Sequence, residues 1–180
     1  MSAGRAAPRT ERAGGEPAKA TVSAAEIAAN NAEVWASLPP NVTMTVIGEL
    51  PELQGPIDHY TQGGPTTTTG ATTRAPATLP FSFTFSGVWS WDGRDFRSTQ
   101  TKICKDIKVK WDFPEESYHK FQVSLSSGGG PINVPTDGVA RSYCWSGVPT
   151  NTTIHFHYAS TNNAPSDIAK ASGSGQVRYP

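Results

Sequence analysis

Aromatic residues are concentrated in the second half of this 180-residue chain, and their distribution limits where a hydrophobic core can form. The chain has seven Phe, five Tyr and five Trp, and only Trp35 and Tyr60 of these precede residue 81. Because aromatic side chains carry the largest apolar areas, residues 81–180 are predicted to contain the core. A unit of about 100 residues can bury more than about 60% of its extended-chain surface, which is enough to fold alone.

Hydrophobic and polar residues alternate through residues 81–180, which is the period of β-strands that bury one face. The clearest alternating runs are 81–91, 106–113, 119–125 and 152–159. Turn-forming residues separate such runs at intervals of roughly 10–15 residues, and no βαβ pattern is present. This pattern predicts a mainly β fold, an antiparallel β-sandwich of the jelly-roll or immunoglobulin-like kind. Gly87 interrupts the first run and is predicted to mark a β-bulge.

Residues 1–22 are predicted to form a disordered tail. The first 20 residues are rich in Ala, Gly, Arg and Pro and contain no aromatic residue, so they bury too little apolar area to offset the entropy of the chain. They also lack the apolar stretch of about 7–15 residues that a secretory signal peptide needs. We therefore expect either that the chain is not exported by that route or that it is a processed form to which Met1 was added.

The clearest helix signal in the chain lies at residues 23–37. Ser23 is a suitable N-cap, and Glu26 completes a capping box with it. Hydrophobic residues at i, i+7, i+8 and i+11 form one narrow stripe, namely Ile27, Val34, Trp35 and Leu38. Asn31 interrupts this stripe, and two consecutive prolines at 39–40 end the helix.

Residues 23–60 are predicted to form an arm that consists of this helix and a short strand over residues 42–47. A helix of about 15 residues is marginally stable alone, so it needs a surface on which to pack. The sequence leaves two possible packing surfaces for this helix, namely the chain's own β-domain and another protein. Residues 61–80, of which eight are Thr and three are Pro, are typical of a low-complexity linker and would tether this arm to the β-domain.

The two cysteines, Cys104 and Cys144, both lie in the predicted β-domain. No CxxC spacing suggests a metal or redox pair, so we expect a disulfide, although two buried free thiols remain the alternative. Closing a loop of this length stabilises a fold by about 4 kcal/mol on the chain-entropy estimate. A disulfide would indicate an oxidising compartment and an extracellular location.

His155 and His157 form the best candidate for a metal site. Residues at i and i+2 of a strand share one face, so both imidazoles are available to one Zn²⁺ or Cu²⁺ ion, with His119 as a candidate third ligand. The alternative is that these are solvent-facing histidines, and on balance no metal or other cofactor is expected. Asp92 and Asp95 can be considered as a glycosidase pair, but closely spaced carboxylates in turns are mostly solvated surface groups.

Tryptophan residues raise the possibility of a glycan-binding site. Trp89 and Trp91 share the parity of the preceding phenylalanines, which favours a place in the core over a place on the surface. Trp145 follows Cys144 and precedes a Ser-Gly turn, so it is predicted to be the most exposed of these rings. An exposed indole face at this position would allow a sugar ring to stack on it.

Net charge and hydropathy exclude some classes of partner. The chain has 15 Lys and Arg against 15 Asp and Glu, so no overall positive field attracts nucleic acid or an anionic membrane surface. No apolar run approaches the ~20 residues that a membrane-spanning helix requires. We therefore expect neither a nucleic-acid partner nor a membrane span.

These patterns favour a non-catalytic, secreted binding or adaptor protein that docks onto a partner protein through its N-terminal arm. A short strand such as residues 42–47 can add to the edge of another sheet. The predicted partner-binding residues are Ile27, Val34, Trp35, Leu38, Val42, Met44 and Val46. Two alternatives are a carbohydrate-binding β-sandwich module that uses Trp145 and an enzyme with an unrecognised, metal-dependent site.

Overall fold

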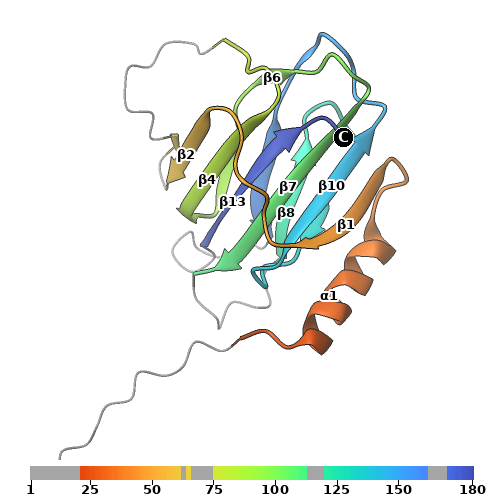
Figure 1. Ribbon diagram of the computed structural model, residues 1–180, viewed down its shortest axis with the longest axis vertical. Coiled ribbons are helices and arrows are strands. Elements are labelled where there is room, and N and C mark those ends of the chain that lie inside the picture. The colour runs from red at the N-terminus through yellow and green to blue at the C-terminus, as the bar shows by residue number, and fades with distance from the viewer. Residues whose placement is uncertain (1–20, 62–63, 66–74, 113–119, 162–169) are drawn as a thin grey trace, which may run out of the picture.

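The computed structural model describes residues 21–61, 64–65, 75–112, 120–161 and 170–180 (Figure 1). The described chain contains one helix, α1 (Ala24–Ser37), and is otherwise built mainly from strands. The larger sheet has seven strands, in the order β1 (Val42–Gly48), β10 (Ala140–Ser146), β7 (Lys102–Trp111), β13 (Ala171–Arg178), β4 (Phe81–Val88), β2 (Ile57–Thr61) and β3 (Gly64–Pro65). A four-stranded sheet has the order β5 (Ser90–Asp92), β12 (Phe156–Thr161), β8 (Lys120–Leu125) and β9 (Ile132–Val134). The remaining pair is β11 (Thr153–Ile154) with β6 (Phe96–Arg97).

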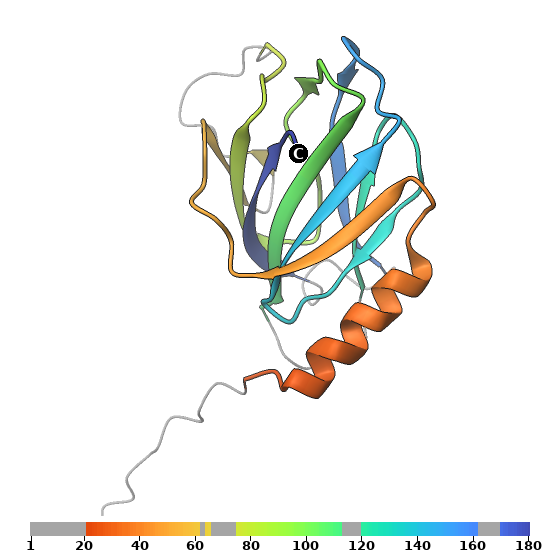
Figure 2. The same ribbon diagram turned by 45° about the vertical axis from the view of Figure 1, so that its right-hand side comes forward.

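The two larger sheets face each other (Figure 2). The buried hydrophobic side chains, many of them aromatic, form one core. Phe85 on β4 contacts Trp91 on β5 and Phe121 on β8, with ring centroids 4.9 and 5.7 Å apart. Trp145 on β10 meets Phe156 on β12 at 5.0 Å. Neighbouring strands are antiparallel except for the parallel pair β2 and β4. The predicted mainly β class and sandwich arrangement are therefore confirmed.

The bulge predicted at Gly87 is present and changes which side chains enter the core. Ala171 of β13 pairs with Val88, and Gly173 pairs with Phe85, so β4 carries one extra residue at this point. Gly87 adopts a φ of +61°, which a residue without a Cβ accepts readily. The extra residue inverts the alternation, so that Val88 is buried and Trp89 is exposed. The prediction that Trp89 shares the inner face is therefore wrong.

The disulfide between Cys104 and Cys144 is formed. The two residues lie directly opposite each other on β7 and β10, with their Cα atoms 4.0 Å apart. Side chains directly opposite each other on antiparallel strands point to the same face of the sheet, so the two sulfur atoms meet there. This bond is compatible with an oxidising, extracellular environment.

Residues 23–60 do not form a separate arm, which corrects the predicted domain boundaries. Strand β1 is the edge strand of the seven-stranded sheet, and Val42 and Met44 pair with Trp145 and Tyr143 of β10. Strand β2 joins the same sheet beside β4. The apolar face of residues 42–47 completes the chain's own core, where it is buried without the entropic cost of association with a second molecule.

The connection from β1 to β2 crosses the outer face of the seven-stranded sheet (Figure 1). At its start Glu49 forms an ion pair with Lys108 of β7 at 3.0 Å. Near its end the Ser82 hydroxyl donates a hydrogen bond to the Gln54 carbonyl oxygen at 2.6 Å. These contacts tie the crossing segment to the sheet, so it is part of the domain.

The predicted linker, residues 61–80, lies partly outside the described residues, as does most of the predicted tail, residues 1–22. The described end of the linker belongs to the fold. Ala77 is buried and forms a bridge with Phe96. A boundary at residue 80 is therefore wrong for the described part of this segment.

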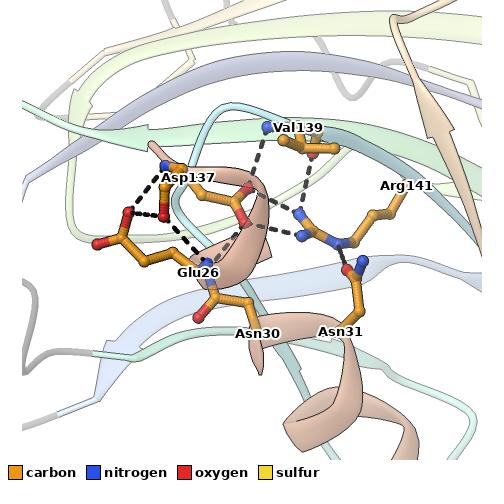
Figure 3. A network of polar contacts seen from close by, with 7 residues as sticks. Glu26, Asn30, Asn31, Asp137, Val139 and Arg141 are labelled. Atoms are coloured by element: carbon orange, nitrogen blue, oxygen red, sulfur yellow. Dashed lines mark hydrogen bonds and ion pairs between the residues drawn. The ribbon is translucent and has the colours of Figure 1, made fainter. Parts of the chain in front are cut away.

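Helix α1 begins as predicted and is fastened to the sandwich by a buried polar network (Figure 3). The Ser23–Glu26 capping box is present. The fully buried Arg141 of β10 donates two hydrogen bonds to the Asp137 carboxylate, at 2.8 and 2.7 Å, and one to Asn31 Oδ1 at 2.8 Å. Asn30 Nδ2 donates to Asp137 at 3.0 Å. Asn31 thus interrupts the apolar stripe because it is the partner of a buried guanidinium group.

Candidate functional site

Two histidines and two aspartates meet at one end of the four-stranded sheet. Asp92 is the last residue of β5 and Asp95 lies in the loop that follows. His157 belongs to β12 and is directly opposite Asp92, while His155 precedes β12 by one residue. The structure therefore brings the predicted histidine pair together with the carboxylates that the sequence had suggested as a separate pair.

The four side chains form a chain of imidazole–carboxylate contacts. His157 Nδ1 lies 2.7 Å from Asp92 Oδ1, and His155 Nδ1 lies 3.1 Å from Asp95 Oδ1. His155 Nε2 lies 3.8 Å from the same Asp92 oxygen. Both imidazole rings thus approach one carboxylate oxygen, and Asp95 engages the opposite side of the His155 ring.

This cluster, which we name the His–Asp cluster (Asp92, Asp95, His155 and His157), offers imidazole nitrogen and carboxylate oxygen at the surface. These are the atoms that bind Zn²⁺ and related ions. In the described part of the chain, no group of three or more His, Cys, Asp or Glu side chains is placed so that it could hold a metal ion. His119, the predicted third ligand, lies outside the described residues.

The predicted partner-binding residues divide into buried and accessible groups. Val34, Val42 and Met44 are buried in the chain's own core, so their side chains are not accessible to a partner. Ile27, Leu38 and Val46 are half-buried. Trp35 alone of the predicted set is well exposed, with 54% of its surface accessible.

Trp35 lies against the outer edge of β1. Its indole Nε1 is 3.5 Å from the carbonyl oxygen of Met44. Ser146 N donates to Asn41 O, so Asn41 and alternate residues after it direct their main-chain groups toward β10, whereas Met44 directs its groups away. No strand in the described part of the chain pairs with this side of β1.

Three exposed apolar side chains belong to α1, the segment before it and β1. In the described chain five large hydrophobic residues are exposed, and three of them, Val22, Trp35 and Ile47, belong to α1, its preceding turn and β1. We name these three residues and the outer edge of β1 the α1–β1 surface. Ile47 was not among the predicted contact residues. Side chains alternate between the two faces of a strand, so Ile47 lies on the face opposite to that of Met44 and Val46.

The predicted exposure of Trp145 is wrong. Its side chain is completely buried, and its ring packs on Phe156 and Tyr143. It contributes to the lining of a small cleft of about 110 Å³ beside Gly129 and Gly147. Trp145 pairs with Ile103 of β7, and both side chains point into the core. The indole face is therefore covered, and a sugar ring cannot stack on it.

A buried amine, which sequence analysis did not single out, lies between the sheets. Lys105 of β7 is fully buried, and its ammonium nitrogen lies 3.9 and 4.3 Å from the ring centres of Phe83 and Phe156. It donates a hydrogen bond to the Tyr158 hydroxyl. Burial lowers the pKa of Lys105 well below its ordinary value of 10.5, and the neighbouring Asp106 carboxylate opposes this shift only in part. The sequence contained a signal for this burial, because Lys105 shares the parity of Ile103 and Ile107 in an alternating strand.

Within the described residues, no helix has the length and apolar character needed to cross a membrane.

Comparisons with protein-family models, with curated proteins and with solved structures each gave no match to this chain.

Proposed function

We propose that this protein is a secreted, non-catalytic binding protein that contacts another protein through the α1–β1 surface. The observation that carries the proposal is the exposed Trp35 beside the outer edge of β1. Tryptophan is enriched among the residues that dominate binding energy at protein interfaces. A large exposed aromatic ring on a folded surface is therefore a candidate anchor.

The edge of β1 suggests how the partner binds. Met44 directs its main-chain groups away from β10, and its carbonyl oxygen accepts the Trp35 indole N–H. A further strand from another protein can add to such an edge if it takes the place of the indole on this oxygen. Trp35 and Ile47 would then flank the added strand and supply apolar contact. The proposed contact is thus a surface of the folded domain, and it replaces the detachable arm that the sequence suggested.

A secreted location is supported by the Cys104–Cys144 disulfide, because such bonds persist mainly in oxidising compartments. The bond joins two central strands of the sheet that carries β1 at its edge. It therefore stabilises the platform on which the proposed contact surface is built.

The test is affinity capture with the disulfide-intact full chain as bait, applied to the secreted proteins of the source organism and quantified by mass spectrometry. We expect Trp35→Ala to reduce recovery of the specific partner at least tenfold, because interface anchors contribute about 2 kcal/mol or more. Trp89→Ala is the matched control, since Trp89 is also exposed but lies between β4 and β5, neither of which pairs with β1. Recovery should be unchanged for this variant.

The proposal fails if the double variant Trp35→Ala, Ile47→Ser retains the same proteins in the same amounts as the wild type. Circular dichroism and the urea unfolding midpoint must show that both variants are folded, so that loss of binding is not loss of structure. Equal losses for Trp35→Ala and Trp89→Ala would also contradict the proposal, because the effect would not be specific to the α1–β1 surface.

A further inference from the structure

We propose that Asn151 is the acceptor of an N-linked oligosaccharide and that Asn41, which begins the same motif, is not. The inference rests on the proposed secreted location and is independent of the α1–β1 surface. The motif Asn-X-Ser/Thr, in which X is not proline, marks the asparagines that secretory glycosylation modifies, and these lie in surface loops. The chain contains this motif twice, at residues 41–43 (Asn-Val-Thr) and 151–153 (Asn-Thr-Thr).

The reaction joins the side-chain amide nitrogen of asparagine to the first sugar of a lipid-linked oligosaccharide diphosphate. A bond forms between the amide nitrogen and C1 of that sugar, the bond from C1 to the diphosphate oxygen breaks, and the lipid diphosphate leaves. The amide nitrogen gives up one proton, and no group is oxidised or reduced. Because the attached group is bulky and hydrophilic, the nitrogen that carries it must face solvent in the folded protein.

Asn151 meets this requirement. It is exposed and lies in the turn between β10 and β11, with the exposed Thr150 and Thr152 on either side. Its main-chain N–H donates to the Ser98 carbonyl oxygen at 2.9 Å, which holds the turn against the loop between β6 and β7. Its φ of +56° is a left-handed conformation that asparagine accepts more readily than most residues. Within the described residues its side-chain amide has no hydrogen-bond partner, so the nitrogen is available for modification.

Asn41 is placed differently. It is half-buried, and its side-chain amide nitrogen donates to the Ser146 carbonyl oxygen at 3.5 Å. A methyl group added to Gly129 would lie 3.1 Å from the same nitrogen, so the glycine loop at residues 128–130 packs closely beside it. Asn41 and Gly129 also line the small cleft beside Trp145. A sugar on this nitrogen would displace the Ser146 contact and the glycine loop, so a chain modified there could not complete this fold.

Each motif can be removed without changing its asparagine. Thr43 of β1 and Thr153 of β11 supply the hydroxyl groups of the two motifs, and both residues are exposed. Valine lacks the hydroxyl but keeps the β-branched shape that suits a strand. Thr153→Val removes the Asn151 motif together with the hydroxyl that accepts the Arg97 Nε–H at 3.1 Å. Thr153→Ser keeps both the motif and a hydroxyl, and Thr43→Val is the matched control at the other motif.

The experiment is secretion of the full chain from cultured eukaryotic cells behind a cleavable secretion signal, followed by peptide mapping. A peptide N-glycosidase converts a glycosylated asparagine to aspartate, and mass spectrometry then locates that residue in the sequence. We expect the wild type, Thr153→Ser and Thr43→Val each to carry a glycan at Asn151 and none at Asn41, and Thr153→Val to carry none at either position. Urea unfolding after removal of the glycan checks that each variant is folded.

An unmodified Asn151 in the secreted wild type would overturn the inference, and so would a glycan that Thr43→Val removes and Thr153→Val retains. Glycans on both asparagines of the secreted, folded protein would also overturn it, because the placement of the Asn41 amide would then have no effect. The proposed partner contact fails by a different result, namely unchanged partner recovery by the Trp35 variants. The two proposals can therefore fail separately.

Discussion

Arg141 and Lys105 are both fully buried on neighbouring strands, but the protein surrounds the two cations in opposite ways. Arg141 meets the Asp137 carboxylate through two hydrogen bonds and is further bonded to Asn31 and to the Val139 carbonyl oxygen. Lys105 is surrounded by aromatic rings and donates to the Tyr158 hydroxyl. One cation has a carboxylate in its own pocket and the other has aromatic rings and a hydroxyl.

The two sites differ in how burial affects the pKa values of Asp137 and Lys105. Burial alone would raise the pKa of Asp137, but the hydrogen bonds from Arg141 and Asn30 outweigh it and hold the pKa below the ordinary value of 3.8. The Asp137 contribution to stability is thus present above pH 3.8 and is lost as the pH falls through the lowered pKa. At Lys105 burial dominates and lowers the pKa, so the charged form is disfavoured in the folded state. The first site anchors α1, whereas the second is a local cost to the core.

The largest effect is expected from Asp137→Ala. This change leaves the Arg141 guanidinium buried without its carboxylate, and breaking a buried ion pair from one side typically costs about 3–5 kcal/mol. The free energy of unfolding, measured by urea denaturation of the disulfide-intact protein at pH 7, should fall by that amount. The amides of α1 should also exchange hydrogen faster, because Asp137 and Arg141 fasten the helix to the sheet.

Glu49→Ala is the matched control for Asp137→Ala. Glu49 pairs with Lys108 at 3.0 Å, but its side chain is almost fully accessible to solvent. An exposed pair contributes about 0–1 kcal/mol, so this variant should unfold within that range of the wild type. Equal losses for the two variants would contradict the view that the Asp137 site is special because it is buried.

An intermediate effect of opposite sign is expected from the double variant Lys105→Met, Tyr158→Phe. Replacing both partners with apolar groups avoids leaving a buried hydroxyl without a partner. Replacing buried ion pairs with well-packed hydrophobic residues is often neutral or stabilising, by up to about 1–4 kcal/mol, and burial already disfavours the charged form of Lys105. The variant should therefore unfold at a higher urea concentration than the wild type at pH 7.

The pH dependence of this difference tests its cause. The pKa of Lys105 is lower in the folded than in the unfolded chain, so the unfolded chain binds more protons and wild-type stability rises with pH up to about 10.5. The advantage of the double variant should consequently be smaller at pH 9.5 than at pH 7. An advantage that does not change with pH would show that packing alone, and not the buried amine, is responsible.

The smallest effect is expected from Ser23→Ala, which removes the N-cap of α1. The Ser23 hydroxyl accepts the Glu26 N–H at 3.2 Å, and loss of such a cap costs about 1 kcal/mol. Urea unfolding should show a loss well below that of Asp137→Ala, with faster hydrogen exchange confined to the first turn of the helix. A loss as large as that of Asp137→Ala would mean that α1 depends on its own cap as much as on the Arg141 network.

Several features could be predicted from the chain alone because they depend on residues that are close in sequence or on unique pairing. The capping box spans four residues, and the bulge follows from one glycine within an alternating run. Cys104 and Cys144 are the only two cysteines, so their pairing had no competitor. The mainly β class followed from the alternation of hydrophobic and polar residues that the strands have in common.

The candidate sites were less accessible to sequence reasoning. The His155–His157 pair was visible from its spacing, but its contact with Asp92 requires β5 and β12 to be neighbours. The burial of Trp145 depends on which face of β10 meets the second sheet. Strand neighbours and sheet faces are set by contacts between distant residues, which periodicity does not specify.

Local patterns along the chain thus establish the strands, the helix start and the disulfide, because each arises from nearby residues or from the absence of an alternative partner. The three-dimensional packing decides that β1 completes the sheet and does not hang free, since its apolar face finds its complement about 100 residues away on β10. It also decides that Trp35 remains at the surface while Val34 enters the core. A hydrophobic pattern shows that one face of a strand must be buried. The long-range pairing of strands determines which part of the molecule covers that face.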